Sequence, residues 1–453
     1  MSRRFVALLA VIWAPMLLWW VALLPGGISN DTLDSWTQIK TGHWASHHPP
    51  PFTAFFWLTS LGGTTPATTS LVESLVVAAS LAWFAMVLAD VLRAGRAVYV
   101  AAVALAVLPL VGPFSVIIWK DVPETAVLLV LTGLLVLGWR RSEPLGRGWW
   151  IAVAGSSFAA GLLRWNGGAT TAVAGVVVAI ALTGRRRWWV GAATAGFGLL
   201  GTGVLLLLPH VSGITPVQPV DSQAEQLADL AQFARNHPHS FTTFDRSVLG
   251  TIAPFSEWRS AGYSCVTVDP VTYYMIRYEH LETALAAERT ALSHLWRKMA
   301  RKHPGELLHA RLCRASLAWS LGDPPRREIP TVHAEVSPND YGLHQLSPAP
   351  LRHAARRYAE LSNDRWVQVL FWRPALWVLL TIAAAAFAGL RRGRWRLLLV
   401  VLAVPLGVLL SYAVEPAAQD ARYTYAATVI CQVATVAYVA GRFRRRRDPG
   451  VTA

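Results

Sequence analysis

Two acidic residues stand close together near the start of the chain, in a polar stretch over residues 29–48. Asp31, Asp34 and Gln38 are three and four residues apart, so a helix running to about Lys40 would place all three on one face. A carboxylate held in this way can take the proton of an attacking hydroxyl as a general base. Asp31 is the first candidate for this role. For Asp34 a catalytic and a structural role fit the pattern equally, and Gln38 is a further candidate.

The alternative is that these residues only start the helix. Ser29, Asn30 and Asp31 are all favoured at the N-cap, and Asp31 followed by Asp34 resembles a capping box. Under this alternative both acids are structural. The helix is expected to stop at the His-His-Pro-Pro-Pro run of residues 47–51, because proline lacks a backbone donor and restricts the residue before it.

Histidines in the same stretch raise the question of a metal ion. His43 and His47 are four residues apart, a spacing that can hold a metal on a helix, but no third ligand is evident. We therefore predict no metal site and no cofactor, although the sequence does not rule out a divalent metal. His48 is a candidate phosphate ligand, and a place on the loop surface is the alternative.

Other ionisable residues stand at the ends of hydrophobic runs further along the chain. Arg164 joins two runs through a very short loop, where its planar guanidinium could bind a phosphate through two hydrogen bonds. Lys120 and Arg422 stand at the starts of two other runs, and we predict that all three cations bind one phosphate. Asp121 is a further catalytic candidate, which could orient a bound substrate or a water molecule. Further candidates, for which structural roles are the alternative, are Glu73, Glu124 and Tyr423.

Membrane-spanning helices are needed to position these residues. The chain has 453 residues, is 54% hydrophobic and only 15% charged, and has a mean hydropathy of +0.38, which is too apolar for an ordinary soluble protein. The first run is long for a signal peptide and lacks a small-residue cleavage site, so we interpret it as a span. We predict an α-helical polytopic membrane protein with about ten transmembrane helices, near residues 5–24, 67–92, 97–113, 122–139, 149–163, 168–183, 188–208, 374–390, 397–414 and 423–441.

Arginine clusters predict the orientation. They fall in every second connection, and they account for much of the net charge of +15, which is therefore no indication of nucleic-acid binding. By the positive-inside rule, both termini are cytoplasmic and the Asp31 loop faces the other side of the plasma membrane. The clusters are Arg3/Arg4, Arg93/Arg96, Arg140/Arg141/Arg147, Arg185–Arg187, Arg391–Arg396 and Arg442–Arg447.

Three segments follow from this pattern. Residues 1–208 form a transmembrane catalytic module of seven spans with a first outer loop over 25–66, and residues 367–453 form a module of three spans. Residues 209–366 are polar and form an extracytoplasmic domain, in which 280–320 are expected to be helical with an interruption at His303-Pro304. Cys265 and Cys313 both lie in this domain, where a disulfide and two free thiols are both compatible with the sequence.

The outer loops resemble those of membrane glycosyltransferases of the GT-C class, and within it the protein O-mannosyltransferase and lipid A aminoarabinose transferase-like branch. That branch has an acid near the start of the first outer loop, then an aromatic-Gly-aromatic region, then His/Lys-Pro-Pro before the second span. The corresponding residues here are Asp31, Trp36, Gly42, Trp44 and His48-Pro49-Pro50. Three further segments resemble outer-loop elements of bacterial members of this class: Trp119-Lys120-Asp121, Arg164–Gly167 and Arg422-Tyr423.

The resemblance implies transfer of a sugar from a polyprenyl-phosphate donor to an extracytoplasmic hydroxyl of a glycan, lipid or protein, with inversion at the sugar. The resemblance also favours Asp31 as the general base. It covers the transmembrane part and not 209–366, so the sugar and the acceptor are not implied. A transporter or flippase of a lipid-linked cell-envelope precursor is the alternative. It would be expected to have charges at the membrane midplane, broken helices and repeats, and no repeat is visible here.

Overall fold

The protein is helical throughout its described length. The computed structural model describes the chain except for residues 1, 141–144, 212, 217–218, 276–285, 322–334, 390–393, 415–417 and 448–453. Within the described residues, strand-like pairing is limited to three isolated bridges. This confirms the predicted α-helical class.

The helices form two compact units. The first comprises Met1–Thr215, Pro330–Ser411 and Arg422–Ala453, and the second comprises Pro216–Ile329 with Tyr412–Ala421. The segment predicted to be one outer domain, 209–366, is therefore divided between them, and residues 330–366 belong to the first unit. Every residue of the predicted site also lies in the first unit.

Among the described residues, six helices are long and apolar enough to cross a membrane, as expected for an α-helical membrane protein. They are α1 (Arg3–Ala22), α4 (Pro66–Leu92), α7 (Asp121–Arg140), α10 (Arg186–Val211), α20 (Arg394–Val414) and α21 (Tyr425–Arg447). A seventh span is possible if α18 (Arg365–Trp372) and α19 (Pro374–Phe387) are taken together, with a bend of 70° between them.

The other predicted spans are shorter helices. They are α5 (Arg96–Val107), α8 (Arg147–Leu163) and α9 (Gly167–Ala181), of 12, 17 and 15 residues. Helix α5 ends early because Pro109 disfavours a helical conformation at Leu108, which is extended (ψ 153°), and the chain turns through α6 (Val111–Phe114). A 12-residue helix covers about 18 Å of a ~30 Å hydrocarbon layer. The total of ten spans stays a prediction.

Glycines allow α8, α9 and α10 to pack closely. A Cβ added at Gly161 would clash with the backbone of α10, one at Gly167 with that of α8, and one at Gly175 with that of α10. Small residues at such crossings bring helix backbones together in membrane proteins. The close packing holds the short connection between α8 and α9, which carries Arg164, in a fixed place.

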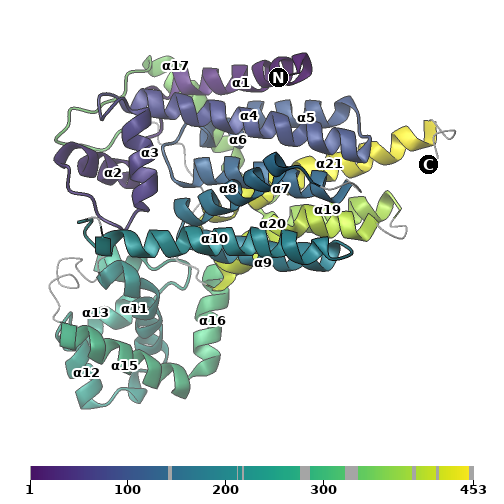
Figure 1. Cartoon of the computed structure of the whole chain (residues 1–453). Coiled ribbons are helices and arrows are strands. Elements are labelled where there is room, and N and C mark those ends of the chain that lie inside the picture. Colours follow the sequence, from purple (N-terminus) through teal and green to yellow (C-terminus); the bar gives the residue numbers. More distant parts are fainter. Residues whose placement is uncertain are drawn as a thin grey trace. The chain divides into compact units, whose positions relative to one another are not determined.

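Two short helices lie at one end of the first unit. Helices α2 (Asn30–Thr41) and α3 (Pro50–Thr59) are on the left of Figure 1, whereas the N-terminus and the end of α21 lie on the right. Trp36 of α2 packs against Phe52 and Phe56 of α3 and against Ile118, all of them buried. Beside them, α17 (Ala349–Glu360) packs on α1 through stacked Trp19 and Tyr358 rings.

The second unit is a small helical domain. Its helices are α11 (Pro219–Asn236), α12 (Thr243–Gly250), α13 (Phe255–Ala261), α15 (Ala286–Lys302) and α16 (Pro304–Arg314), around a core that includes Phe233, Trp258 and Met299. The predicted interruption at His303-Pro304 is confirmed, because α15 ends and α16 begins there. The first residues of the predicted 280–320 helix lie outside the described residues.

A disulfide joins Cys265 to Cys313 in this unit, and the remaining cysteine, Cys431, is buried in α21. A denatured, oxidised sample should therefore take one maleimide-polyethylene glycol tag, at Cys431, and three after reduction. Replacing Cys265 and Cys313 with serine should lower the free energy of unfolding of the second unit by ~2–4 kcal/mol, because the bridge closes a loop of 48 residues. Three tags before reduction would show that the bridge does not form.

Candidate functional site

The start of α2 is fixed by Ser29. Its hydroxyl accepts a hydrogen bond from the Thr32 backbone N–H (3.2 Å), and the Thr32 hydroxyl accepts one from the Ser29 N–H (3.2 Å). These two bonds form the capping box, so the alternative in which Asp31 and Asp34 form it is wrong. Asp31 lies in the first turn, where its carboxylate is free to interact with other parts of the chain.

Helix α2 ends at Thr41, close to the predicted end at Lys40, but the residue that stops it differs from the expectation. Gly42 adopts a left-handed conformation (φ 73°) and ends the helix before the His-Pro run is reached. His43 therefore lies beyond the helix, and the helical spacing of His43 and His47 does not apply. The next helix, α3, begins at Pro50.

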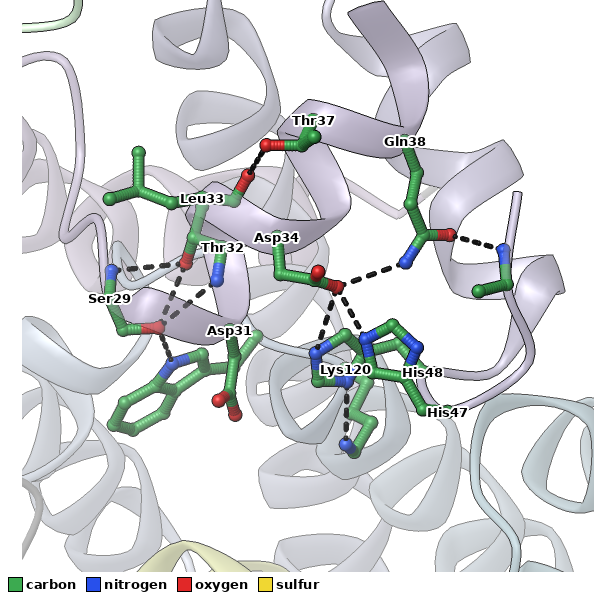
Figure 2. Close-up of polar contacts among 12 residues, drawn as sticks. Ser29, Asp31, Thr32, Leu33, Asp34, Thr37, Gln38, His47, His48 and Lys120 are labelled. Atoms are coloured by element: carbon green, nitrogen blue, oxygen red, sulfur yellow. Dashed lines mark hydrogen bonds and ion pairs between the residues drawn. The ribbon is translucent and has the colours of Figure 1, made fainter. Parts of the chain in front are cut away.

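The loop before α7 is pinned to the start of α2. The Thr32 hydroxyl donates to the Ile118 carbonyl (2.8 Å), and the Trp119 indole N–H donates to the Ser29 hydroxyl (2.7 Å). A parallel bridge joins Gly27 to Ile117, and a Cβ at Gly27 would lie 2.7 Å from the Ile117 side chain. This pairing brings Lys120 beside α2, as Figure 2 shows.

Asp31 forms an ion pair with Arg422, from just before the last helix. The distance between Asp31 Oδ2 and Arg422 Nη1 is 2.6 Å, and Arg422 also donates to the Tyr423 hydroxyl (3.2 Å) and lies over the Trp119 ring. Burial by itself raises the pKa of Asp31, but the positive charges of Arg422 and Lys120 lower it well below its usual range. Asp31 is ionised at neutral pH, with 38% of its side chain exposed.

Asp34 is the centre of a separate hydrogen-bond cluster, drawn in Figure 2. Its Oδ2 accepts from Gln38 (2.9 Å) and lies 2.6 Å from His47 Nε2 and 3.5 Å from His48 Nε2. The Gln38 carbonyl in turn accepts from the Ala45 N–H (3.0 Å). The predicted shared face of Asp34 and Gln38 is confirmed. The contacts of Asp34 connect α2 to the loop that carries His47 and His48, so this cluster positions the two histidines relative to α2.

Asp34, His47 and His48 also form a possible metal-binding group, with ligand atoms within 4.8 Å of one another. The sequence did not indicate it, because only the His43–His47 spacing was visible. The hydrogen bonds favour a metal-free cluster. Lys120 Nζ lies 3.3 Å from His48 Nδ1, so an ammonium there donates to Nδ1 and leaves the proton on Nε2, the atom that faces Asp34. A metal at Asp34 would need the lone pair of that same Nε2.

Lys120 and His48 are both shielded from solvent. Burial lowers the pKa of Lys120, and the carboxylates of Asp31 and Asp121 oppose this shift. Burial also lowers the pKa of His48, as does the Lys120 charge, to about 3. His48 is therefore a neutral imidazole at physiological pH and accepts a hydrogen bond from the Lys120 cation.

The lowered pKa of His48 predicts a pH-dependent stability. A histidine in the unfolded chain takes up a proton near pH 6.5, whereas folded His48 does so only near pH 3. The unfolded state therefore binds more protons between these values, and the free energy of unfolding should fall as the pH falls through this window. We expect the unfolding temperature of His48→Gln to decrease less than that of the wild type between pH 6.5 and 4.

The exposed His43 supplies the matched control for this measurement, because it lies in the same loop. His43→Gln should follow the wild-type curve. Identical slopes for His48→Gln and the wild type would show that His48 takes up its proton equally in both states. The lowered pKa values of Asp31 and Asp34 add their own loss of stability, which begins about one pH unit above their ordinary value of 3.8 and grows as the pH falls.

Arg164 is held by two carboxylates at the start of α7. Its Nη1 lies 3.0 Å from Asp121 Oδ1 and 3.1 Å from Glu124 Oε2, and its guanidinium lies over the Tyr423 ring. Burial opposes its charge, but the two carboxylates raise the pKa of Arg164 overall. Tyr423 is in contact with both Arg164 and Arg422, so its ring links the two cations.

The predicted residues are thus brought to one end of the first unit, in three connected groups. These are the Asp31–Arg422–Tyr423 group, the Asp121–Glu124–Arg164 group and the Asp34–His48–Lys120 group. Glu73, in α4, is fully buried and interacts electrostatically with Asp121. Neither of its carboxylate oxygens has a hydrogen-bond partner among the described residues. Sequence reasoning missed the positioning roles of Thr32, Trp119 and His47, which depend on tertiary contacts.

A small cavity adjoins the candidate base. It measures about 10 Å³ and is lined by residues that include Asp31, His48, Lys120 and Asp121. A space of this size holds at most one water molecule. This cavity can therefore hold a sugar only if the surrounding side chains rearrange, whereas the part of the Asp31 side chain outside it is exposed.

Comparisons of the chain with protein-family models, with curated proteins and with solved structures found no match.

Proposed function

We propose that the protein is a membrane glycosyltransferase that moves a sugar from a polyprenyl-phosphate donor to an extracytoplasmic hydroxyl. One observation supports this most directly. A carboxylate, Asp31, shares one end of an apolar helical unit with three cations from separate loops: Lys120, Arg164 and Arg422. A general base beside fixed positive charges is what transfer from a phosphate leaving group needs.

The reaction is a single displacement. The acceptor oxygen forms a bond to the anomeric carbon, the bond from that carbon to the phosphate oxygen breaks, and Asp31 takes the hydroxyl proton. Polyprenyl phosphate leaves with the bonding electrons, and Lys120 and Arg422 stabilise its charge. Inversion at the sugar is the outcome that the resemblance implies.

The Asp31–Arg422 pair suggests how the base is activated. A carboxylate with a strongly lowered pKa is a weak base, and Arg422 is the main positive charge that lowers it. A donor phosphate that binds Arg422 competes with Asp31 for the guanidinium. The pKa of Asp31 then moves back towards its ordinary value, so that the base becomes effective when the donor is bound.

The orientation proposed for the first unit has both termini in the cytoplasm. The alternation of arginine clusters supports it, and so does the disulfide in the second unit, because structural disulfides persist mainly in oxidising compartments. Reporter fusions at Gly213 and after residue 447 provide the test. A cytoplasmic signal at Gly213 would place the site in the wrong compartment and end this mechanism.

The activity itself is tested with purified full-length protein and a panel of radiolabelled polyprenyl-phosphate sugars. We expect labelled sugar to be released from one donor class, together with free polyprenyl phosphate, and we expect the Asp31→Asn protein to release far less. Equal release by both proteins would indicate a contaminating activity. No release from any donor, by protein that still binds one of them, would favour the alternative below.

A flippase of a lipid-linked precursor is the second candidate. Two observations favour it: the 70° bend between α18 and α19, since broken helices are common in transporters, and the buried Glu73 in α4. Proteoliposomes containing a fluorescent polyprenyl-phosphate sugar separate the two functions. A flippase moves the intact lipid between leaflets and leaves the sugar attached, whereas a transferase releases it.

A further inference from the structure

A second candidate binding site lies at the opposite end of the first unit. A groove of about 1050 Å³ runs between α1 and α5, with the ends of α4 and α21 at its mouth. This volume is at the upper end of the ~300–1,000 Å³ that is usual for ligand pockets. No residue of the proposed catalytic site lines it.

The groove combines an apolar wall with a cationic mouth. The wall includes Val11, Val100 and Val107, which are 54%, 67% and 46% exposed. The mouth is lined by Arg4, Arg96 and Arg444, with Asp90 as the one acid. The mouth therefore carries a net charge of about +2, and the Tyr99 phenol is the one uncharged polar side chain in a lining that is otherwise apolar.

Helix α5 adds to the positive potential at the mouth. Its N-cap is Gly95, which has no side chain to bond the free backbone N–H groups of the first turn. Arg444 packs directly on this glycine, since a Cβ there would lie 2.6 Å from its Nη1. Three arginines from three helices and one uncapped helix start thus converge on one place, which favours a phosphate group.

The length of the groove matches one half of a bilayer. Eleven residues separate Arg96 from Val107 on α5, and seven separate Arg4 from Val11 on α1, which corresponds to about 16 Å and 10 Å along the two helices. The hydrocarbon layer is ~30 Å thick, so each leaflet contributes ~15 Å. An acyl chain whose headgroup lies at the arginines would reach the bottom of the groove near the bilayer midplane.

We propose that this groove binds an anionic phospholipid of the leaflet at the chain termini. The phosphate lies against Arg4, Arg96 and Arg444, and one acyl chain lies along the valines. An acyl chain gains little by leaving apolar lipid for an apolar wall, so selectivity comes from the headgroup. The site is separate from the proposed transfer reaction and depends only on the insertion of the first unit in a membrane.

Native mass spectrometry of the full-length protein tests this with two probes, phosphatidylglycerol and phosphatidylcholine. We expect retention of phosphatidylglycerol over phosphatidylcholine, and a fall in this preference of up to about 100-fold when Arg4, Arg96 and Arg444 are replaced with glutamine, since each of the three arginines near an anionic headgroup contributes roughly fivefold. The charge-matched control replaces Arg140, Arg147 and Arg185, which are exposed and do not line the groove.

Two further measurements keep the test decisive. Val100→Trp fills the groove at an exposed position, and it should release the lipid although all three arginines remain. Millimolar inorganic phosphate should not displace the lipid. The proposal is wrong if the control loses as much preference as the groove variant, if Val100→Trp retains lipid like the wild type, or if inorganic phosphate displaces it completely.

Discussion

Replacing Asp31 with asparagine is expected to lower turnover by about 10²–10⁴-fold, which is the usual contribution of a general base. Asparagine keeps the size of the side chain but has no useful proton affinity. Helix α2 should be unaffected, because Ser29 and Thr32 supply its capping box. Donor affinity should be equal to or tighter than that of the wild type, since Arg422 loses the partner that competes with the phosphate.

Two other Asp→Asn variants serve as controls for Asp31→Asn. Asp34→Asn removes an acid from the same helix face and should have the smaller effect on turnover, through disturbance of the His47–His48 loop. Asp340→Asn removes an exposed acid and should behave like the wild type. Normal turnover in Asp31→Asn would exclude Asp31 as the base and move the search to Asp34 or Asp121.

Replacing Arg422 with glutamine should lower turnover by about 10²–10³-fold, the typical cost of removing one donor that stabilises transition-state charge. It should also raise the KM for the donor. In addition, the pKa of Asp31 should rise, because its closest positive charge is gone. A base must be deprotonated to act, so the acidic limb of the pH–rate profile should move to higher pH.

Arg185→Gln, at an exposed position, is the control for loss of one positive charge. The double variant with Asp31→Asn and Arg422→Gln should lose less than the product of the two single effects, because the residues are in direct contact. Fully multiplicative losses, or an unchanged acidic limb in Arg422→Gln, would show that the two residues act independently.

Local features of the site could be predicted from the sequence. The length of α2 and the shared face of Asp34 and Gln38 follow from helical spacing. Outside the site, the break at Pro304 follows from proline chemistry. The identity of the cap could not be predicted, since Ser29, Asn30 and Asp31 are all suitable. The choice depends on Ile118 and Trp119, which bond Thr32 and Ser29 from 86 and 90 residues away.

The partners of the charged residues could be predicted only as a group. The predicted topology put Lys120, Arg164 and Arg422 on the same side of the membrane as Asp31, but no sequence pattern indicated which cation pairs with which acid. Tertiary packing decides which acid each cation meets. Arg422 pairs with Asp31, whereas Arg164 binds Asp121 and Glu124. Whether these cations bind phosphate stays a prediction.

The pairing of Asp31 with Arg422 also has a consequence for biogenesis. The two residues are 391 positions apart, so the ribosome must synthesise nearly the whole chain before Asp31 can meet its partner. Until residue 422 is made, the first loop lies beside the membrane with an unpaired carboxylate and no Arg422 to bind a phosphate. An incomplete nascent chain therefore lacks the central ion pair of the proposed site, which can form only after residue 422 has been made.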